Sequence, residues 1–202
     1  MRGVVSFILR CYARPMSTQP ATPVEVYASL VGRIDEASVQ RITQNLSPGT
    51  APTANISRLH VLFQSSGGIV GDGVFLYNYF RSFPIELIFY NSGTIASIGV
   101  VAFLGAQGRK ASASATFMIH RTSYNSQAAS AAVLGGLAQA AVIEDQRTET
   151  ILRQYLTMPD AKWTDLRNSA DVMITAAEAL TFGLIDEIAD FSPPRGVQLF
   201  YL

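Results

Sequence analysis

The chain has 202 residues, of which 49% are hydrophobic and 15% charged, enough for one well-packed domain but crowded for two. Its 15 basic residues balance 15 acidic ones, so no net charge favours nucleic acid or an anionic membrane, and we expect neither as a partner. The single Cys11 excludes an internal disulfide, and no Cys/His spacing is typical of a metal site. We therefore expect a cytoplasmic protein that needs no metal ion or other cofactor.

Residues 1–22 stand apart from the pattern of the rest. The first fifteen residues carry three arginines, no acid and a short apolar run at 4–9. That run is too short to span a membrane and short even for a signal peptide, and an Ala-x-Ala cleavage pattern is absent. Two interpretations remain open: a weak targeting segment, or sequence upstream of a start at Met16. We expect a flexible segment at 1–22, a folded domain at 23–190 and a proline-interrupted tail at 191–202.

Strand and helix patterns alternate along the folded part. Hydrophobic periodicity predicts strands at 24–31, 59–63, 85–90, 116–120 and 171–174. It predicts helices at 36–46, 70–83, 94–104, 128–156 and 161–168, with a loop at 47–55 and a turn at 105–109. A capping box, Thr175-Ala-Ala-Glu178, opens a last helix that stops at Gly183. This order with short connections predicts an α/β fold with right-handed crossovers and a mostly parallel sheet.

Ser97 is the candidate nucleophile. It lies where the apolar strand at 85–90 gives way to a helix of small residues. Unpaired backbone N–H groups and the positive end of a helix dipole favour an anion beside the start of a helix. The Gly-x-Ser-x-Gly pattern of α/β-hydrolases is absent because Ile95 stands at its first glycine. Taken alone, a serine between Ala and Ile is usually only a small residue that allows close packing, so the role of Ser97 depends on partners elsewhere.

Candidate partners lie at the ends of neighbouring predicted strands. His120 ends one predicted strand and is the candidate general base. His60 lies inside a predicted strand and is the negative control, a histidine with no expected catalytic role. The backbone N–H groups of Gly68 and Ile98 are candidate oxyanion donors, and Asp171 is a candidate orienter of the imidazole. Strand ends meet at one edge of an open α/β sheet, so these groups are expected to lie together.

Four segments, in order, resemble the proteolytic subunit of the Clp protease, a serine peptidase with a crotonase-like fold. Gln64-Ser-Ser-Gly-Gly68 resembles its Asn-Ser-Pro-Gly-Gly loop, and Gly93-Thr-Ile-Ala-Ser-Ile-Gly99 its nucleophile segment. Phe117-Met-Ile-His120 resembles its Met-Ile-His base, and residues 171–187 its Asp-x-x segment with Gly-Leu-Ile-Asp. The resemblance implies repeated β-β-α and βα units with a protruding handle helix, and a catalytic domain over residues 23–190.

By this resemblance the chain is a serine endopeptidase that cleaves peptides or unfolded proteins through an acyl-enzyme. Ser97 is then the nucleophile, His120 the base, Asp171 its orienter, and Gly68 and Ile98 the oxyanion donors. Substrate contacts are implied for Gly67, Gly68, Ile69 and Thr122. A homo-oligomeric ring, a heptamer or stacked heptamers, is also implied, and the long helix at 128–156 has apolar surface that a single domain would leave uncovered.

Several departures from the family pattern leave finer points open. Ser66 replaces a proline, Arg121-Thr122 replaces Gln-Pro, and residues 123–130 lack the expected glycines, so substrate preference is not fixed. About two dozen residues precede the first strand, too few for an axial loop and a first amphipathic helix. These departures disfavour, but do not exclude, docking to an AAA+ ATPase.

Three functions other than the peptidase also fit parts of this sequence. The first is a non-catalytic ring subunit, which the Ser66 and Arg121 changes would favour. The second is an acyl-CoA enzyme of the crotonase type, since fold alone does not fix function. The third is a signal-peptide peptidase with a Ser/Lys dyad, for which Lys110 is the candidate base.

Overall fold

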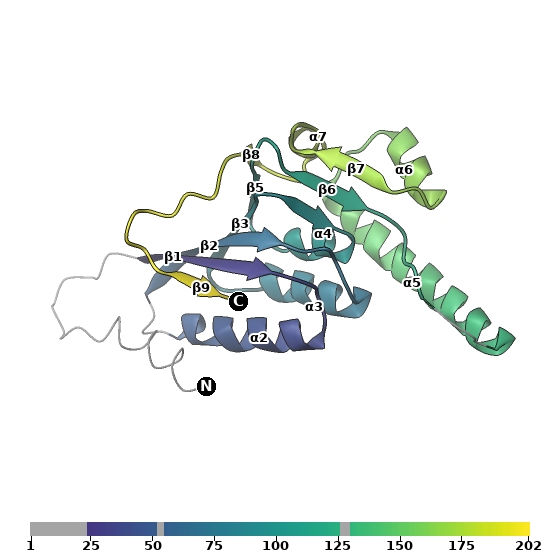
Figure 1. Cartoon of the computed structure of the whole chain (residues 1–202), viewed down its shortest axis with the longest axis horizontal. Helices are drawn as coiled ribbons and strands as arrows, with labels where there is room; N and C mark the ends of the chain where they lie inside the picture. Colours follow the sequence, from purple (N-terminus) through teal and green to yellow (C-terminus); the bar gives the residue numbers. More distant parts are fainter. Residues whose placement is uncertain (1–23, 52–54, 126–129) are drawn as a thin grey trace.

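The computed structural model describes residues 24–51, 55–125 and 130–202 (Figure 1). The expectations for residues 1–22 and for the middle of the segment at 123–130 therefore lie outside the described residues. The described chain is a mixed α/β fold with a mostly parallel sheet, as the sequence predicted. None of its helices is long and apolar enough to cross a membrane.

The larger sheet has six strands, and every neighbouring pair in it is parallel. In spatial order they are β8 (Glu187–Ile188), β5 (Gly108–Ala111), β3 (Glu86–Asn91), β2 (Ile56–Gln64), β1 (Val24–Val31) and β9 (Leu199–Tyr201). β9 was not predicted, and it extends the sheet at the outer edge of β1.

A smaller sheet of three strands lies beside the first. β4 (Thr94–Ala96) pairs parallel with β6 (Thr116–Ile119), and β6 pairs antiparallel with β7 (Val172–Thr175). A single bridge between Ser65 and Ile95 joins the two sheets at the end of β2. The ends of β2, β4 and β6 are thereby brought together.

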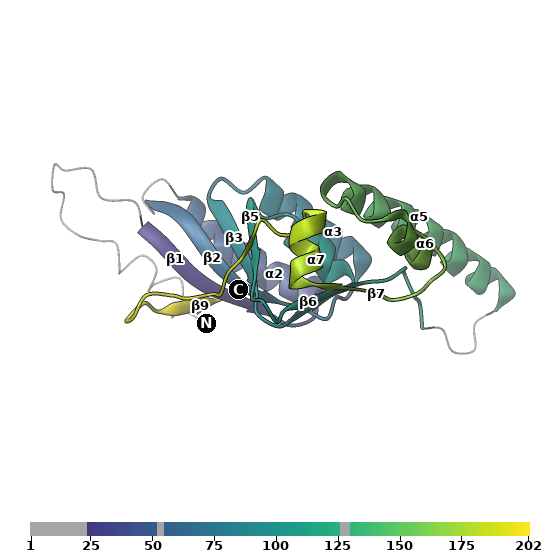
Figure 2. The ribbon, with the colours of Figure 1, turned by 90° about the horizontal axis from the view of Figure 1, so that it is seen from above.

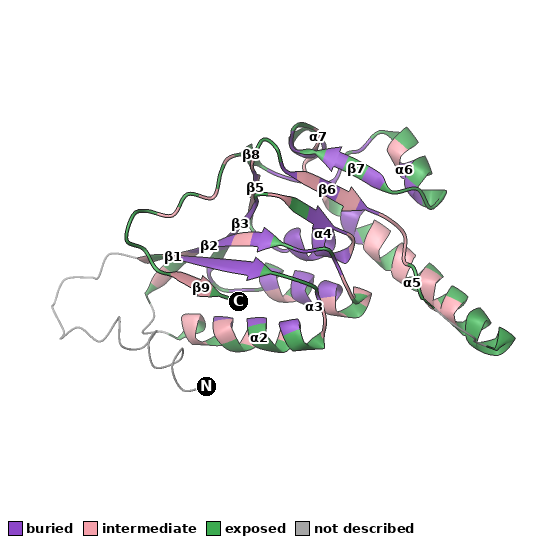
Figure 3. Cartoon of the chain, viewed as in Figure 1, coloured by how far each residue is buried: buried purple, intermediate pink, exposed green. Residues whose placement is uncertain are grey.

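The helices supply the rest of the core. Buried side chains of α2 (Glu36–Leu46), α3 (Val70–Arg81) and α4 (Ile98–Phe103) belong to the same apolar cluster as the strands (Figure 3). Phe103 of α4 contacts Phe63 and Phe89 of the larger sheet and Phe117 of the smaller one, with ring centroids 5.5–6.1 Å apart. This aromatic contact fixes α4 between the two sheets.

The long helix α5 (Ala131–Tyr155) projects from the body of the molecule, which confirms the expected handle (Figures 1 and 2). Ile151 and Leu152, near its C-terminal end, are buried against the body, whereas Val133, Leu134 and Ile143 are about half exposed or more. After α5 come α6 (Asp160–Arg167), β7 and α7 (Ala176–Phe182). A short 3-10 helix, Ser47–Thr50, lies within the predicted loop.

The predicted ends of helices and turns agree with the structure in some places and differ in others. The capping box is formed, with Thr175 accepting from the Glu178 N–H, and Gly183 ends α7 in the left-handed conformation at φ 82°. The helix predicted at 94–104 is wrong in its first turn, because residues 94–96 form β4 and the helix begins at Ile98. Ile95 pairs with Phe117 in the smaller sheet, a tertiary interaction that local periodicity does not reveal. The turn predicted at 105–109 likewise gives way to β5 at Gly108.

Candidate active site

Ser97 forms a sharp turn between β4 and α4. Its backbone has φ 58° and ψ −135°, and it is one of three non-glycine residues with positive φ in the described chain. Such a conformation costs about 1–3 kcal/mol and persists only where the surroundings impose it. Here the Ser97 N–H donates to the Met118 carbonyl at 2.7 Å, and the Ala96 N–H to the Ser65 carbonyl at 2.8 Å. The neighbouring strands therefore hold the serine in a strained strand-to-helix turn, a geometry that presents a nucleophilic hydroxyl.

The glycine pair after β2 packs against this turn. A Cβ atom on Gly67 would lie 2.5 Å from the Ser97 Cβ, and one on Gly68 would lie 1.9 Å from the Ile34 carbonyl oxygen. Both glycines also have positive φ, 91° and 157°. Only glycine meets both conditions without strain, so the close approach of this loop to Ser97 depends on these residues.

His120, directly after β6, contacts Ser97. Its Nε2 lies 2.8 Å from the Ser97 Oγ, within hydrogen-bond distance, and both residues are half-buried. The pairing of β6 with β4, which places Ala96 beside Met118, brings the two side chains to the same edge. A serine hydroxyl and an imidazole at this distance meet the geometric requirement for a nucleophile and its general base.

Asp171 precedes β7 and lies near this pair by strand register. β6 and β7 are antiparallel with Ile119 opposite Val172, so extending the register by one residue sets Asp171 opposite His120. Residues opposite one another in an antiparallel pair have Cβ atoms about 4.5–5.5 Å apart. The Asp171 side chain is exposed, and it makes no hydrogen bond or ion pair with another described residue. The resting structure therefore brings Ser97 and His120 together but leaves the carboxylate unengaged.

A hollow of about 80 Å³ opens beside the Ser97 hydroxyl. Four of the predicted site residues besides Ser97 line it: Gly68, Ile98, His120 and Thr122. Gly67 does not line the hollow but packs against Ser97. Ile69, the residue before α3, is half exposed and does not line the hollow either. Sequence reasoning missed three lining side chains from α4 and α5, which are Val101, Thr148 and Leu152.

The backbone N–H groups of Gly68 and Ile98 are candidate hydrogen-bond donors to an oxyanion at this hollow. Ile98 is the first residue of α4, and the N–H groups of a first helical turn have no acceptor within the helix. The Gly68 N–H donates to no other described residue, although its neighbours Gly67 and Ile69 bond to Ile34 through their carbonyl and N–H groups. Free donors beside a nucleophile can stabilise negative charge on a substrate oxygen.

Arg121 and Asp145 form an ion pair beside the candidate base. The Arg121 Nε donates to Asp145 Oδ2 at 2.7 Å, and the Thr122 N–H donates to Asp145 Oδ1 at 2.7 Å. The Arg121 Nη1 also donates to the carbonyl of Arg167, the last residue of α6, at 3.1 Å. Sequence reasoning noted Arg121 as a departure but gave no signal for Asp145, because their contact joins a strand end to a helix across 24 residues.

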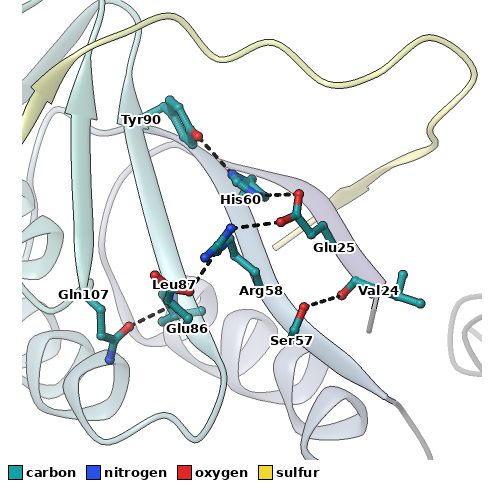
Figure 4. A network of polar contacts seen from close by, with 9 residues as sticks. All are labelled: Val24, Glu25, Ser57, Arg58, His60, Glu86, Leu87, Tyr90 and Gln107. Carbon is teal, nitrogen blue, oxygen red and sulfur yellow. Dashed lines mark hydrogen bonds and ion pairs between the residues drawn. The ribbon is translucent and has the colours of Figure 1, made fainter. Parts of the chain in front are cut away.

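The other histidine lies inside the larger sheet. His60 is 7% exposed, and its ring stacks on Tyr27 with centroids 4.6 Å apart. Its Nδ1 lies 2.9 Å from the Tyr90 hydroxyl (Figure 4). Its Nε2 lies 3.4 Å from Glu25. Burial lowers the pKa of His60, and the nearby Glu25 offsets part of that effect. Within the described residues, the polar partners of this ring are Tyr90 and Glu25, and no serine is among them, which supports a structural and not a catalytic place for His60.

Other candidate chemistry finds no support at this edge. Lys110 pairs with Glu187 at 2.6 Å, and it does not line the hollow at Ser97, which disfavours a Ser/Lys dyad. No group of three or more His, Cys, Asp or Glu side chains in the described chain is arranged to hold a metal ion. A second hollow, of about 60 Å³, lies among apolar side chains of β1, α2 and β9, away from Ser97.

The chain was also compared with known protein families and with curated proteins. A comparison with curated proteins found no match. The family model for the Clp protease matches residues 24–192, which is most of the chain and includes the handle helix and every strand except β9. Members of this family are serine peptidases that form oligomeric rings and act on peptides. The chain therefore belongs to the Clp protease family.

Proposed function

We propose that this protein is a serine endopeptidase that cleaves peptides through an acyl-enzyme on Ser97. The observation that carries the proposal is the 2.8 Å contact between the Ser97 Oγ and the His120 Nε2, formed at a strained turn. Strain at a strand-to-helix turn, a base within reach and a hollow beside the hydroxyl are the expected parts of such a site. Family membership supports the same reaction class.

In the proposed reaction, the Ser97 Oγ attacks the carbonyl carbon of the scissile bond while its proton passes to the His120 Nε2. The resulting oxyanion accepts hydrogen bonds from the N–H groups of Gly68 and Ile98. The C–N bond then breaks, and the amine leaves with the proton from His120. Water, activated by the same imidazole, releases the acyl group and restores the serine.

Asp171 is the proposed orienter of the imidazole. Its place opposite His120 in the extended strand register supports this role, although its carboxylate makes no hydrogen bond in the resting structure. A change of its side-chain rotamer would bring the carboxylate toward the ring, and catalytic hydrogen bonds often tighten only when substrate binds. Thr122 and Gly68, which line the hollow, are proposed to contact substrate, and Gly67 and Ile69 to shape the adjoining strand edge.

We also propose that the protein works as a homo-oligomeric ring. The exposed apolar side chains of the projecting helix, among them Val133, Leu134, Val142 and Ile143, support a contact with other copies. A heptamer or a pair of stacked heptamers is the assembly expected from the family.

One competing proposal is a non-catalytic subunit of such a ring. The unengaged carboxylate of Asp171 favours it, because an imidazole without an orienter is a weaker base. The two proposals differ in whether Ser97 reacts with an electrophile that requires an activated hydroxyl.

The test is labelling of the purified protein with a fluorophosphonate probe, with the same samples sized by native mass spectrometry. Ser97→Ala should abolish labelling, whereas Ser92→Ala, which removes an exposed hydroxyl five residues earlier, should leave it unchanged. Equal labelling of the protein and of Ser97→Ala would refute the peptidase mechanism. A ring that does not label at all would support the non-catalytic subunit.

A further inference from the structure

The imidazole of His120 has few direct constraints. Its contact with the Ser97 Oγ is the sole hydrogen bond of the ring to a described residue. The Asp171 carboxylate, which would hold the other side of the ring, is exposed and unbonded. The position of the ring therefore depends on the backbone at residues 120–122, which continues from β6 beyond its last ladder pair at Ile119.

Asp145 fixes that backbone to the handle helix. Its two carboxylate oxygens accept from the Thr122 N–H and from the Arg121 Nε, each at 2.7 Å. The Asp145 side chain is 13% exposed, so its carboxylate lies largely out of water, whereas the Arg121 side chain is 35% exposed. Hydrogen bonds between charged groups are shorter and stronger than neutral ones, and they become stronger still where solvent is excluded.

Arg121 extends the same connection to a third segment. Its Nη1 donates to the Arg167 carbonyl, one of the carbonyls that a helix C-terminus leaves without an intrahelical partner. From α6 the chain continues through three residues to Asp171. One guanidinium therefore joins the segment that carries the base, the handle helix and the segment that leads to the orienter.

We propose that Arg121 and Asp145 form a positioning clamp that holds His120 against Ser97. This inference rests on the peptidase activity proposed above. The clamp acts through backbone geometry. Asp145 holds the backbone after His120 through its bond from the Thr122 N–H, and the positive charge of Arg121 holds the Asp145 carboxylate in place. Two hollows flank His120, one beside Ser97 and one of about 20 Å³ toward α6, and both are lined by Arg121. The ring thus has space to turn away if the clamp is loosened.

The expected effect follows from the geometry of proton transfer. A displacement of about 1 Å at a catalytic group can cost about 100-fold in rate, so a loosened clamp should slow attack by Ser97 about 10- to 100-fold. Neither clamp residue touches the serine, and Asp145 does not line the hollow beside it, so access of the probe to the hydroxyl should persist in Asp145→Asn. Asp145→Asn is the mildest change, since its amide oxygen still accepts from Thr122 while the charge pairing with Arg121 is lost.

The experiment compares Arg121→Gln, Asp145→Asn, the Arg121→Gln/Asp145→Asn double variant and Arg121→Lys in the full-length protein. The measured quantity is the rate constant for fluorophosphonate labelling of Ser97. This rate constant is a property of each folded site, whereas partial unfolding lowers only the final extent of labelling. Thermal unfolding of each variant gives an independent check on the fold. The control is Arg147→Gln, which removes a charge paired with Glu144 on the same helix.

Each single neutral variant should lower the rate constant about 10- to 100-fold, and the double variant should lose no more than the worse single one. Arg121→Lys should recover part of the loss by restoring the charge, and Arg147→Gln should stay within about 2-fold of the unaltered protein. Unchanged rate constants in the clamp variants, with normal labelling of the unaltered protein, would overturn the clamp alone. Failure of the unaltered protein to label would overturn the peptidase proposal and the clamp with it.

Discussion

His60 lies within a strand of this fold and His120 directly after one, and the two side chains differ in burial, in polar partners and in the open space beside them. His60 lies within β2, is nearly buried, and bonds to Tyr90 while stacking on Tyr27. His120 lies one residue beyond β6, is half-buried, and contacts the Ser97 hydroxyl beside a hollow that both residues line. The His60 ring is held by a stacked aromatic ring and by polar groups near both of its nitrogens, whereas the His120 ring has one hydrogen-bond partner among the described residues.

The difference lies in position along the strand. A residue in the middle of a parallel sheet has neighbours on adjacent strands and layers above and below it, so its polar atoms must find fixed partners. A residue at the end of a strand has room on one side for a ligand and can meet groups from neighbouring strand ends. Replacing His120 should therefore change mainly activity, and replacing His60 should change mainly stability.

Replacing His120 should give the largest effect. His120→Ala should lower kcat/KM for a chromogenic peptide by about 10³-fold or more, because Ser97 loses its general base. The melting temperature should change little, since the half-buried ring has one hydrogen bond to the described residues. Steady-state kinetics and thermal unfolding measure the two quantities, and a variant that keeps full activity would break the comparison.

Crowding the surroundings of His120 and Ser97 should come next. In Gly68→Ala the added Cβ would lie 1.9 Å from the Ile34 oxygen, so the loop must move and the proposed oxyanion donor moves with it. We expect activity to fall about 10²-fold, the size of effect seen when an oxyanion donor is lost. Gly71→Ala, where nothing lies within 4 Å of the new Cβ, is the control and should retain activity. Equal activity of the two variants would argue against the Gly68 donor.

Replacing His60 should alter stability and spare the chemistry. His60→Ala leaves the buried Tyr90 hydroxyl without its described partner and removes the ring stacked on Tyr27. The free energy of unfolding should fall by about 1–3 kcal/mol. Urea denaturation measures this loss, and the rate constant for labelling Ser97 should be unchanged. A slower rate constant would show that the two regions are coupled.

Acid should weaken the fold through His60. Burial lowers the pKa of His60 in the folded protein, so the unfolded chain binds the proton more readily and stability falls as pH drops below the unfolded pKa of about 6.5. The loss is at most about 1.4 kcal/mol for each pH unit between the two pKa values. His60→Gln, which does not titrate, should lose less stability between pH 7.5 and 5.5 in urea denaturation at each pH. Parallel losses in both proteins would contradict this assignment.

The exposed charges around His60 should matter least. Arg58 pairs with Glu25 at 2.9 Å and Glu86 at 2.8 Å, and these side chains are 38–45% exposed (Figure 4). Ion pairs in water contribute about 0–1 kcal/mol, so Arg58→Met should lower the free energy of unfolding by no more than that. A larger loss in urea denaturation would mean that the polar network, and not burial, holds His60.

The sequence predicted most of the architecture because its signals were local. Periodicity and capping residues located β1, α2 and α7 to within a residue or two, and short connections implied the parallel sheet. Strand ends and the family resemblance gave Ser97 and His120 as partners, and the structure sets them at hydrogen-bond distance. The roles proposed for them, and for Asp171, await the tests above.

What the sequence missed depended on contacts between distant residues. β4 forms because Ile95 meets Phe117, and the positive φ of Ser97 is imposed by hydrogen bonds from the neighbouring strands. The partner of Arg121 lies on a helix 24 residues away, one of several acids along it. Neither propensity nor spacing carries such information, because both describe a residue by its neighbours in the chain.

The pairing of β9 with β1 also shapes how the protein acquires its fold. Tyr27 pairs with Leu199, so the outer edge of β1 is completed by residues synthesised long after it. During translation that edge exposes unpaired N–H and C=O groups beside the apolar side chains of β1. Contacts between residues so far apart in the sequence also form slowly. A nascent chain of this protein therefore carries an open strand edge for most of its synthesis, the state in which a chaperone would have most to protect.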